Sequence, residues 1–495
     1  MGRLCLLYPK GNAARSDKTD KRGNTNMNRD FADDLLRGTL EKKCPAWARA
    51  LLVLAAAAVF FVFAQAARYR LLDEVASHLY SENLMITSVM FTLLFALSAA
   101  VQMRAGRDLP TGALILLLAV TGFVLLGKIS LLDYNSDDYD IFLSNWIYTY
   151  SGMGLKEGLG AYIGSDYTPP YLYLLLIISR FKDYPWQYMI KAISMGFEVL
   201  MGYAMMKLAG MKMKGAAGPL MVYHIAQLLP TVVFNGAYWG QCDVIYTSFC
   251  LLALYLALTK RPVRAMACFG AALSFKLQTV FFLPVLLPLW LRKDVKLRHV
   301  LMIPVAYMGM MLPALWGGKS VHHVLTCYLQ QAGAYNFITV NAPSLYQLLP
   351  QSMPADTLYS MFSPMALCLG FAMLMVICAV VAWRRDALSD DAVLLACLLT
   401  LGGVPLFLPK MHERYMFGAD VLALIAAVYN PRRLLLPLLF GMASYVCYTE
   451  GLPGEPVMSL TYATLMLMAA VALTGYELWR ELNRREDAKA MEVKA

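Results

Sequence analysis

Long apolar segments recur along this chain at short intervals, and they constrain the fold more than any other feature. The first three cover residues 46–67, 83–103 and 111–132, and similar segments continue as far as residue 479. A helix needs roughly 20 mainly apolar residues to cross a bilayer, where the backbone must satisfy its own hydrogen bonds. The chain is 59% hydrophobic and only 15% charged, whereas soluble domains carry about 25% charged residues. The sequence therefore predicts an all-α, polytopic transmembrane helical bundle.

The apolar segments predict about 14 spans. After the first three we expect 186–207, 217–238, 241–258, two short helices within 264–291, 298–316, 359–383, 392–408, 417–429, 433–449 and 457–479. Basic connections such as "TKRPVR" and "RKDVKLR" separate alternate spans, as the positive-inside rule requires of cytoplasmic loops. The net charge of +10 therefore indicates orientation in the cell membrane, with both termini inside, and does not indicate nucleic-acid binding.

Polar segments divide the chain further. Residues 1–45 are expected to form a disordered, basic cytoplasmic tail, 46–480 the transmembrane domain, and 481–495 a second cytoplasmic tail. The apolar run 46–67 ends in a tripeptide that resembles a signal-peptidase site, but the long polar stretch before it favours a retained anchor. Two large outer loops are expected at 133–185 and 317–358. The first contains an apolar run, 169–181, too short to span, which predicts a juxtamembrane or re-entrant helix.

Unusual polar residues map to the outer ends of the predicted spans. The most acidic stretch is "NSDDYDIFL", with Asp137, Asp138 and Asp140 directly after the third apolar run. The others are Asp166, Tyr167, Asn235, Trp239, Gln241, Asp243, Lys276, Gln278, Asn341, Tyr346, His412, Glu413 and Arg414. Polar residues that converge at one membrane depth indicate a functional site.

Each of these residues also has a purely structural interpretation. Asp137 and Asp140 fit solvated loop acids, and Trp239 fits the aromatic belt at the membrane interface. Asp243 begins a predicted helix and fits an N-terminal cap, whereas Lys276 fits a side chain that snorkels to the interface. The triplet 412–414 fits a structural ion pair.

This set of acidic, cationic and amide side chains suits transfer of a sugar from a lipid-phosphate donor. An acid can act as general base toward a hydroxyl nucleophile, and cations can neutralise a phosphate leaving group. If the backbone is extended, Asp138 and Asp140 point the same way, so a shared divalent ion is a less favoured alternative to a site without metal or other cofactor. The sequence contains no Walker loop, dinucleotide fingerprint, nucleophile elbow or HExxH motif.

Six ordered motifs between residues 137 and 418 carry a family resemblance: "DDYDIFLSNW", "SDYTPPYLYLL", "WGQCDVIY", "LSFKLQTVFFLP", "NAPSLY" and "PKMHERYMF". In these the chain resembles the bacterial relatives of the GPI-anchor mannosyltransferases, which are integral-membrane GT-C glycosyltransferases. The resemblance implies a polyprenyl-phosphate-linked hexose donor, such as a mannose donor, a glycan, lipid or protein acceptor, and inverting transfer outside the cell. Its motif DYxxFLxxW implies that Asp138 is the general base, with Asp137 and Asp140 as alternates.

The same resemblance implies that "HERY" faces the donor phosphate, with Arg414 and Lys276 as charge partners. We expect Arg414→Ala to impair binding or leaving-group stabilisation while leaving the fold intact. The chain departs from the family in two ways. The acidic loop follows the third span, so residues 46–103 form an added hairpin, and Asn145 stands where the family commonly has proline. The competing hypotheses are a transporter or flippase of lipid-linked sugars and, less favoured, a scaffold or a polymerase. Transporters concentrate polar residues at the midplane, whereas these residues map to one face.

Overall fold

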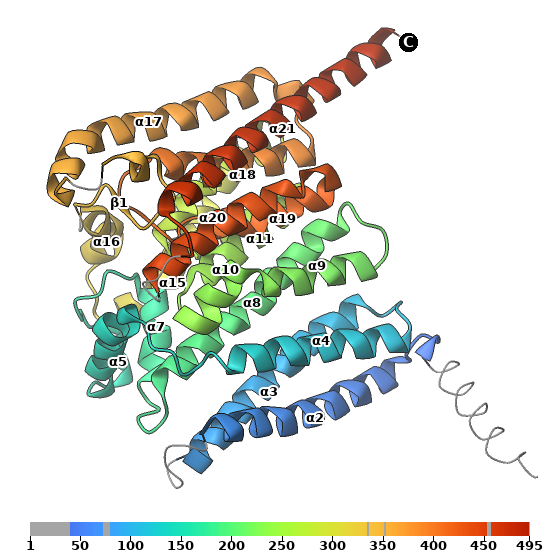
Figure 1. Ribbon diagram of the computed structural model, residues 1–495, viewed down its shortest axis with the longest axis vertical. Helices are drawn as coiled ribbons and strands as arrows, with labels where there is room; N and C mark the ends of the chain where they lie inside the picture. The colour runs from blue at the N-terminus through green and yellow to red at the C-terminus, as the bar shows by residue number, and fades with distance from the viewer. Residues whose placement is uncertain (1–39, 73–79, 334–335, 351–352, 453–456, 495) are drawn as a thin grey trace, which may run out of the picture.

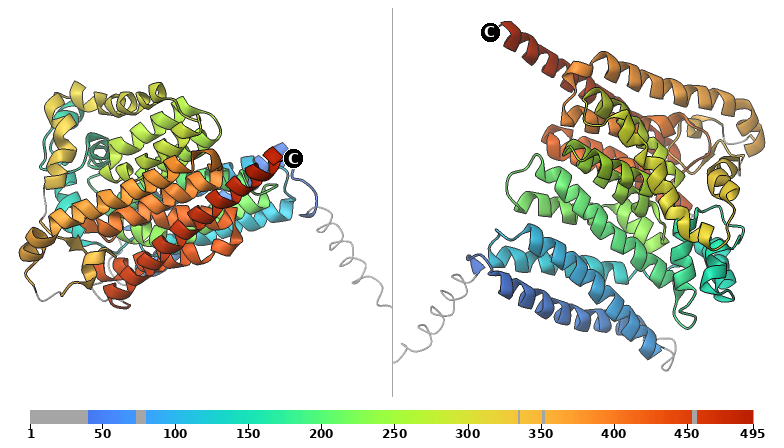
Figure 2. Two further views of the ribbon diagram at one scale, coloured as in Figure 1. Left: turned by 90° about the horizontal axis from the view of Figure 1, so that it is seen from above. Right: turned by 180° about the vertical axis from the view of Figure 1, so that it is seen from behind.

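The computed structural model describes residues 40–72, 80–333, 336–350, 353–452 and 457–494. Within these residues the chain is a bundle of helices that lie side by side (Figures 1 and 2). The described strands are the two-residue β1 (Thr339–Val340) and β2 (Met411–His412), which pair in parallel. The prediction of an all-α bundle is confirmed.

The helices follow the apolar segments closely. They are α2 (Ala46–Leu72), α3 (Tyr80–Ala105), α4 (Thr111–Ile129), α5 (Ser144–Ser151), α6 (Leu155–Gly160), α7 (Pro169–Ile178), α8 (Trp186–Gly210), α9 (Ala217–Leu228), α10 (Pro230–Val233), α11 (Asp243–Leu258), α12 (Pro262–Phe275), α13 (Leu286–Leu291), α14 (Leu297–Val300), α15 (Met302–Trp316), α16 (Val321–Gly333), α17 (Ala355–Trp383), α18 (Asp390–Phe407), α19 (Phe417–Tyr429), α20 (Leu435–Gly451) and α21 (Leu460–Lys494). Two π-helical segments, η1 (Tyr139–Leu143) and η2 (Phe234–Trp239), interrupt them, and short 3₁₀ turns connect others.

Nine helices of the described part are long and apolar enough to cross a membrane, so the protein is membrane-embedded. A tenth candidate is the pair formed by α9 and residues 230–239, which is bent by 55°. The apolar helices α11, α12 and α19 and the segment 277–291 are shorter. These four segments and the bent pair account for the difference between nine and the predicted 14.

The first three helices form a module with their own hydrophobic cluster. In it the Phe60 and Phe95 rings stack at 4.9 Å between α2 and α3. This module includes the predicted added hairpin and lies along one side of the bundle (Figure 1). Polar contacts attach it to the remaining helices: Ser98 shares a 2.7 Å hydrogen bond with Tyr223, and Lys128 pairs with Glu198.

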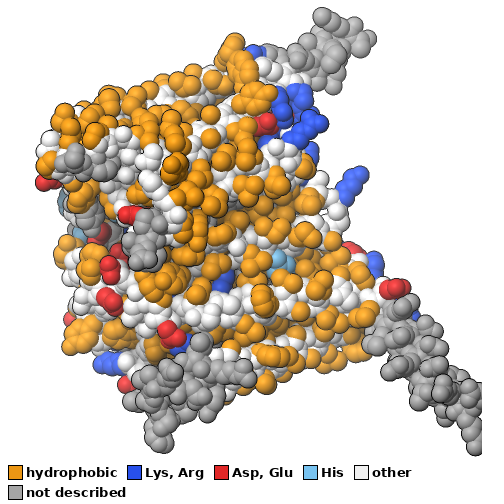
Figure 3. All heavy atoms as spheres, viewed as in Figure 1, with side chains coloured by type: hydrophobic (Ala, Val, Ile, Leu, Met, Phe, Trp, Pro, Cys, Tyr) orange, Lys and Arg blue, Asp and Glu red, His pale blue; other side chains and the backbone are white. Residues whose placement is uncertain are grey.

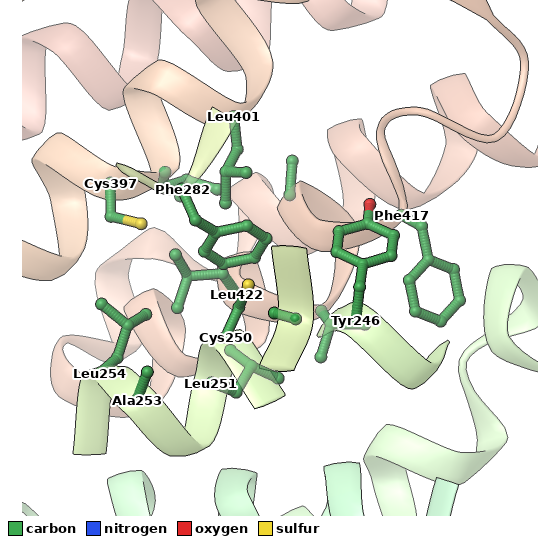
Figure 4. Close-up of a cluster of buried hydrophobic side chains, with 14 of the residues drawn as sticks. Tyr246, Cys250, Leu251, Ala253, Leu254, Phe282, Cys397, Leu401, Phe417 and Leu422 are labelled. Carbon is green, nitrogen blue, oxygen red and sulfur yellow. The ribbon is translucent and has the colours of Figure 1, made fainter. Parts of the chain in front are cut away.

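The main core is built from α11, α12, α18, α19 and the segment after α12. Figure 4 shows Cys250 of α11 among its apolar neighbours, with Cys397 and Leu401 of α18 and Phe282 close by. Cys250 and Cys397 are fully buried, and the cysteines of the described part are free thiols. Apolar surroundings suit the weakly polar thiol of these two residues, whereas Cys368 of α17 is exposed. A helix that is apolar on all sides belongs inside a bundle, and α18 occupies that position.

The two ends of the bundle differ in charge. At one end, here named the site end, α4 and α18 finish and α8 and α11 begin. At the opposite or basic end lie Arg104, Lys207, Arg261, Arg292 and Arg384, each next to a helix terminus. Figure 3 shows acidic side chains toward its left edge, near the site end, and most of the visible Lys and Arg on the right. The helix α21 continues as a helix to Lys494, through the predicted second tail; the predicted first tail up to residue 39 lies outside the described residues.

Candidate functional site

The acidic stretch forms the first element of the site. After α4 the chain makes a short turn and becomes helical at Asp137, and η1 then runs directly into α5. Asp138 has helical dihedrals, with φ −58° and ψ −37°. Residues two apart on a helix point to opposite sides. The expectation that extended backbone aims Asp138 and Asp140 in one direction is therefore wrong, and the shared-ion alternative loses its geometric basis.

Of the three carboxylates, only Asp138 is engaged with the other predicted site residues. Asp137 and Asp140 are exposed, whereas the Asp138 side chain is 31% exposed. Its Oδ2 accepts a 2.6 Å hydrogen bond from Gln241 Nε2 and lies 3.9 Å from Arg414 Nη1. The carboxylate is thus held on one side and open on the other.

Local backbone geometry places Gln241. The π-helical segment η2 ends at Gly240, whose φ of +82° lies in the left-handed region that glycine adopts without strain. The Gln241 amide then donates to the Asn235 carbonyl at 2.8 Å, and its own carbonyl accepts from Ser194 Oγ at 2.7 Å. These two contacts fix the backbone from which the Gln241 side chain reaches Asp138.

Arg414 forms the cationic wall of the site. Its Nη1 donates to Glu413 Oε1 at 2.7 Å, and its guanidinium lies over the Trp239 ring, 5.0 Å from the centroid. Burial raises the pKa of Glu413 above its ordinary value. Burial opposes the charge of Arg414, but the Glu413 and Asp138 carboxylates raise its pKa well above its ordinary value. Trp239 is buried beneath this cation, so it is not part of a lipid-facing aromatic belt.

The paired strands hold Arg414 in place. Val340 of β1 pairs with His412 of β2, and the Glu413 amide donates to the Val340 carbonyl at 3.1 Å. Asn341, with φ +51°, bridges to His412 in the same short pairing. The motifs "NAPSLY" and "PKMHERYMF" therefore meet because their backbones are hydrogen-bonded.

Beside Asp138 lies a second polar cluster, whose side chains are buried and paired with one another. Asp243 is fully buried, its Oδ1 accepts from Lys276 Nζ at 2.6 Å, and its Oδ2 accepts from Asn235 Nδ2 at 3.0 Å. Asn235 also donates to the Tyr448 hydroxyl at 3.0 Å. Asp243 begins α11 as predicted, but its buried ion pair goes beyond the role of a cap. Lys276 does not snorkel to the interface, because its ammonium is buried against this carboxylate.

Two further predicted residues lie in or beside these clusters. Tyr167 packs edge-on against Trp146 at 5.9 Å; burial raises its pKa well above the ordinary value, and it interacts electrostatically with Cys242 and Arg414. Gln278 is buried and interacts with the Tyr415 hydroxyl.

Other predicted residues have supporting positions. Tyr346 is buried in a separate hydrophobic cluster, and its hydroxyl donates to the Phe407 carbonyl at 2.7 Å. The carbonyl oxygen of Asp166 accepts a hydrogen bond from Cys327 Sγ at 3.8 Å. His412 packs against Tyr415 at 5.1 Å, and burial, reinforced by Arg414 and Lys276, lowers its pKa to about 3.

The sequence interpretation missed residues that support the site from within the bundle. Lys191 of α8 is buried, and its ammonium donates to the carbonyls of Leu131, Leu132 and Tyr134 at 2.9, 3.0 and 2.7 Å. It therefore anchors the turn that leads to Asp138. A lysine inside the apolar run 186–207 was the available signal, since an ionisable residue within a membrane span indicates a role by default. Tyr448 carried no such signal in its apolar helix.

Both π-helical segments of the described chain border this site. Asp138 directly precedes η1, and Asn235 and Trp239 belong to η2. A π-helical turn is rare and is found disproportionately at functional sites. The two irregular segments therefore reinforce the assignment of the site to this end of the bundle.

A scan against models of protein families finds no match to this chain, and a search of curated proteins finds no significant match.

Proposed function

We propose that the protein is a GT-C-type membrane glycosyltransferase. It would transfer a hexose, with mannose the first candidate, from a polyprenyl-phosphate-linked donor to a glycan, lipid or protein acceptor outside the cell. The proposal places the site end of the bundle on the extracytoplasmic side of the cell membrane, as the basic residues at the opposite end favour. The proposal includes no cofactor.

One observation carries the proposal: the partly exposed Asp138 carboxylate is hydrogen-bonded by Gln241 and flanked by Arg414 in a membrane-embedded protein. Among the acids of the site, the Asp243 carboxylate is already paired with Lys276, and the Glu413 carboxylate is already paired with Arg414. Asp138 alone combines a fixed orientation with an open side. Those are the requirements for a general base that must reach an acceptor hydroxyl.

The reaction balances with these groups. The acceptor oxygen attacks the anomeric carbon of the donor, its proton passes to Asp138, and the bond between that carbon and the phosphate oxygen breaks. The polyprenyl phosphate leaves with the bonding electron pair, and attack from the opposite face inverts the anomeric configuration. We assign to Arg414 the role of neutralising charge that develops on the departing phosphate; its Nη1 lies 3.9 Å from Asp138 Oδ2, and its guanidinium lies over the Trp239 ring.

A second candidate function, transport or flipping of a lipid-linked sugar, is favoured by a different observation. Lys128 of α4 and Glu198 of α8 form an ion pair that is almost fully buried within the bundle. Charged residues inside spans often belong to transport pathways. The one-sided position of Asp138, Gln241 and Arg414 favours the enzyme.

The experiment that separates them uses purified full-length protein and synthetic polyprenyl-phosphate-mannose. We expect transfer to a hydroxyl acceptor by the wild type, and a loss of about 10²–10⁴ in rate for Asp138→Asn. Asp137→Asn and Asp140→Asn are matched controls, because both remove a neighbouring exposed carboxylate; each is expected to stay within a few-fold of wild type.

The outcomes have distinct meanings. Wild-type turnover by Asp138→Asn contradicts the assignment of the base. No transfer by the wild type with several donors and acceptors, together with donor movement across proteoliposomes, supports the transporter and contradicts the enzyme.

A further inference from the structure

A second recess lies at the basic end of the bundle, far along the helices from Asp138. It is an open cleft of about 1160 Å³ between the end of α3 and the end of α8, and it also reaches α9 and α11. The N-terminal module forms one wall and the main bundle the other. None of the residues assigned to the candidate site lines this cleft.

The rim of the cleft is cationic. Arg104 comes from the last turn of α3, Arg107 from the turn that follows, and Lys207 from the last turn of α8. Asp108 is the one acid that lines the cleft among the described residues; it already accepts a 3.1 Å hydrogen bond from Lys43, and Arg107 lies 3.8 Å from its other oxygen. The net charge of the rim is therefore positive even when the Asp108 carboxylate is included.

The walls below the rim are apolar. They include Leu97 and Val101 of α3 and Val199 and Leu200 of α8. At the mouth the Lys207 ammonium lies over the Tyr203 ring, 5.4 Å from the centroid, which restrains the cation beside the opening. Cations above a hydrocarbon slot match a molecule that has an anionic head and an aliphatic tail.

The position of the rim cations along their helices indicates which class of anionic molecule the cleft would bind. Arg104 and Lys207 lie in the last turns of two membrane-spanning helices, at the level of lipid head groups. Basic pockets between transmembrane helices recognise anionic phospholipids, and a Lys or Arg near the membrane surface is attracted to an anionic leaflet. A soluble phosphate would use the rim but would leave the apolar walls uncovered.

We infer that this cleft binds one anionic membrane phospholipid, with its head-group phosphate at Arg104 and Lys207 and its acyl chains along the walls formed by α3 and α8. The bound lipid would fill the gap between the N-terminal module and the main bundle and would stabilise their contact. This site is separate from the proposed donor site and does not depend on the proposed function.

The test measures thermal unfolding of the purified full-length protein in a neutral detergent. Dioleoyl-phosphatidylglycerol is titrated as the anionic probe and dioleoyl-phosphatidylcholine as its neutral counterpart. We expect a saturable rise in Tm with phosphatidylglycerol only, because a ligand that binds the folded state alone raises its stability. The double variant Arg104→Gln/Lys207→Gln is expected to raise the midpoint of that titration at least tenfold.

The matched control is Arg264→Gln/Arg298→Gln, which removes two exposed cations that do not line the cleft. It is expected to keep the wild-type midpoint. If the first double variant does not fold, the single variant Arg107→Gln replaces it, since Arg107 is exposed, and a threefold rise in midpoint is expected.

Three results would overturn the inference. They are an equal rise in Tm with phosphatidylcholine, an unchanged phosphatidylglycerol midpoint in the cleft variants, or a rise in that midpoint in the control variant as large as in the cleft variants. A tenfold preference for polyprenyl monophosphate over phosphatidylglycerol would also overturn it, since the cleft would then serve the lipid carrier.

Discussion

Gln241 Nε2 donates a 2.6 Å hydrogen bond to Asp138 Oδ2, and this contact joins segments 103 residues apart. The donor leaves the second carboxylate oxygen free and directs it to one side. In the proposed reaction, Gln241 therefore sets the direction from which Asp138 accepts a proton.

The first prediction concerns this hydrogen bond. Gln241→Leu is expected to lower kcat about 10- to 100-fold, since hydrogen bonds to charged groups contribute about 1.5–3 kcal/mol. Tm is expected to change little, because Asp138 stays partly hydrated. Steady-state kinetics and thermal unfolding measure the two effects. A variant with wild-type kcat would show that Gln241 does not orient the base.

The second prediction concerns Arg414 and Glu413. The sequence alone predicts that Arg414→Ala leaves the fold intact, but the structure pairs Arg414 with the buried Glu413. Removing one partner of a buried ion pair costs about 3–5 kcal/mol, so Arg414→Gln is expected to lower Tm as well as transfer. The double variant Glu413→Gln/Arg414→Gln is expected to recover most of the Tm and none of the transfer. Recovery of transfer in the double variant would contradict a role for Arg414 at the donor phosphate.

The third prediction concerns pH. Burial, with Arg414 and Lys276, lowers the pKa of His412 to about 3, against about 6.5 in an unfolded chain. Between pH 3 and pH 6.5 the unfolded state binds more protons, so His412 makes stability rise with pH across this window, by about 1 kcal/mol per pH unit or less. Glu413 acts in the opposite direction above its unfolded pKa, because burial raises its folded pKa. We expect His412→Gln to remove the His412 contribution from the slope of Tm against pH.

His322→Gln is the control for the loss of an imidazole, since His322 is exposed on α16. It is expected to keep the wild-type slope of Tm against pH. Identical slopes of Tm against pH for wild type and His412→Gln would contradict a neutral His412 in the folded protein.

The fourth prediction concerns Lys191, a positioning residue. Lys191→Met removes the donor of three carbonyls in the turn before Asp138. A misplacement of about 1 Å can cost about 10² in rate, so kcat is expected to fall while the KM for the donor stays close to wild type. Amide hydrogen exchange over residues 133–140 is expected to become faster. Lys182→Met controls for the loss of charge, since Lys182 is an exposed lysine in the turn before α8. Unchanged hydrogen exchange in Lys191→Met would show that the turn before Asp138 does not need this anchor.

The sequence predicted helices well and local site geometry less well, and the difference has a physical cause. In lipid each apolar segment must satisfy its own backbone hydrogen bonds, so α2, α3 and α4 follow from composition alone. The backbone after α4 is not under that constraint. Its choice between helix and extended chain is made by contacts such as those of Lys191, and the extended form expected for Asp138–Asp140 was wrong.

By itself, the sequence determined that the protein is a membrane-embedded helical bundle and that its unusual polar residues gather near one end, because apolar length and basic connections depend on local composition. Only the tertiary structure decided which acid stays open. Asp138 and Asp243 are both aspartates beside helix starts, yet Lys276 closes Asp243 whereas Gln241 orients Asp138 and leaves it accessible. Partners far apart in sequence make that distinction, and helix packing, which no local pattern encodes, brings them together.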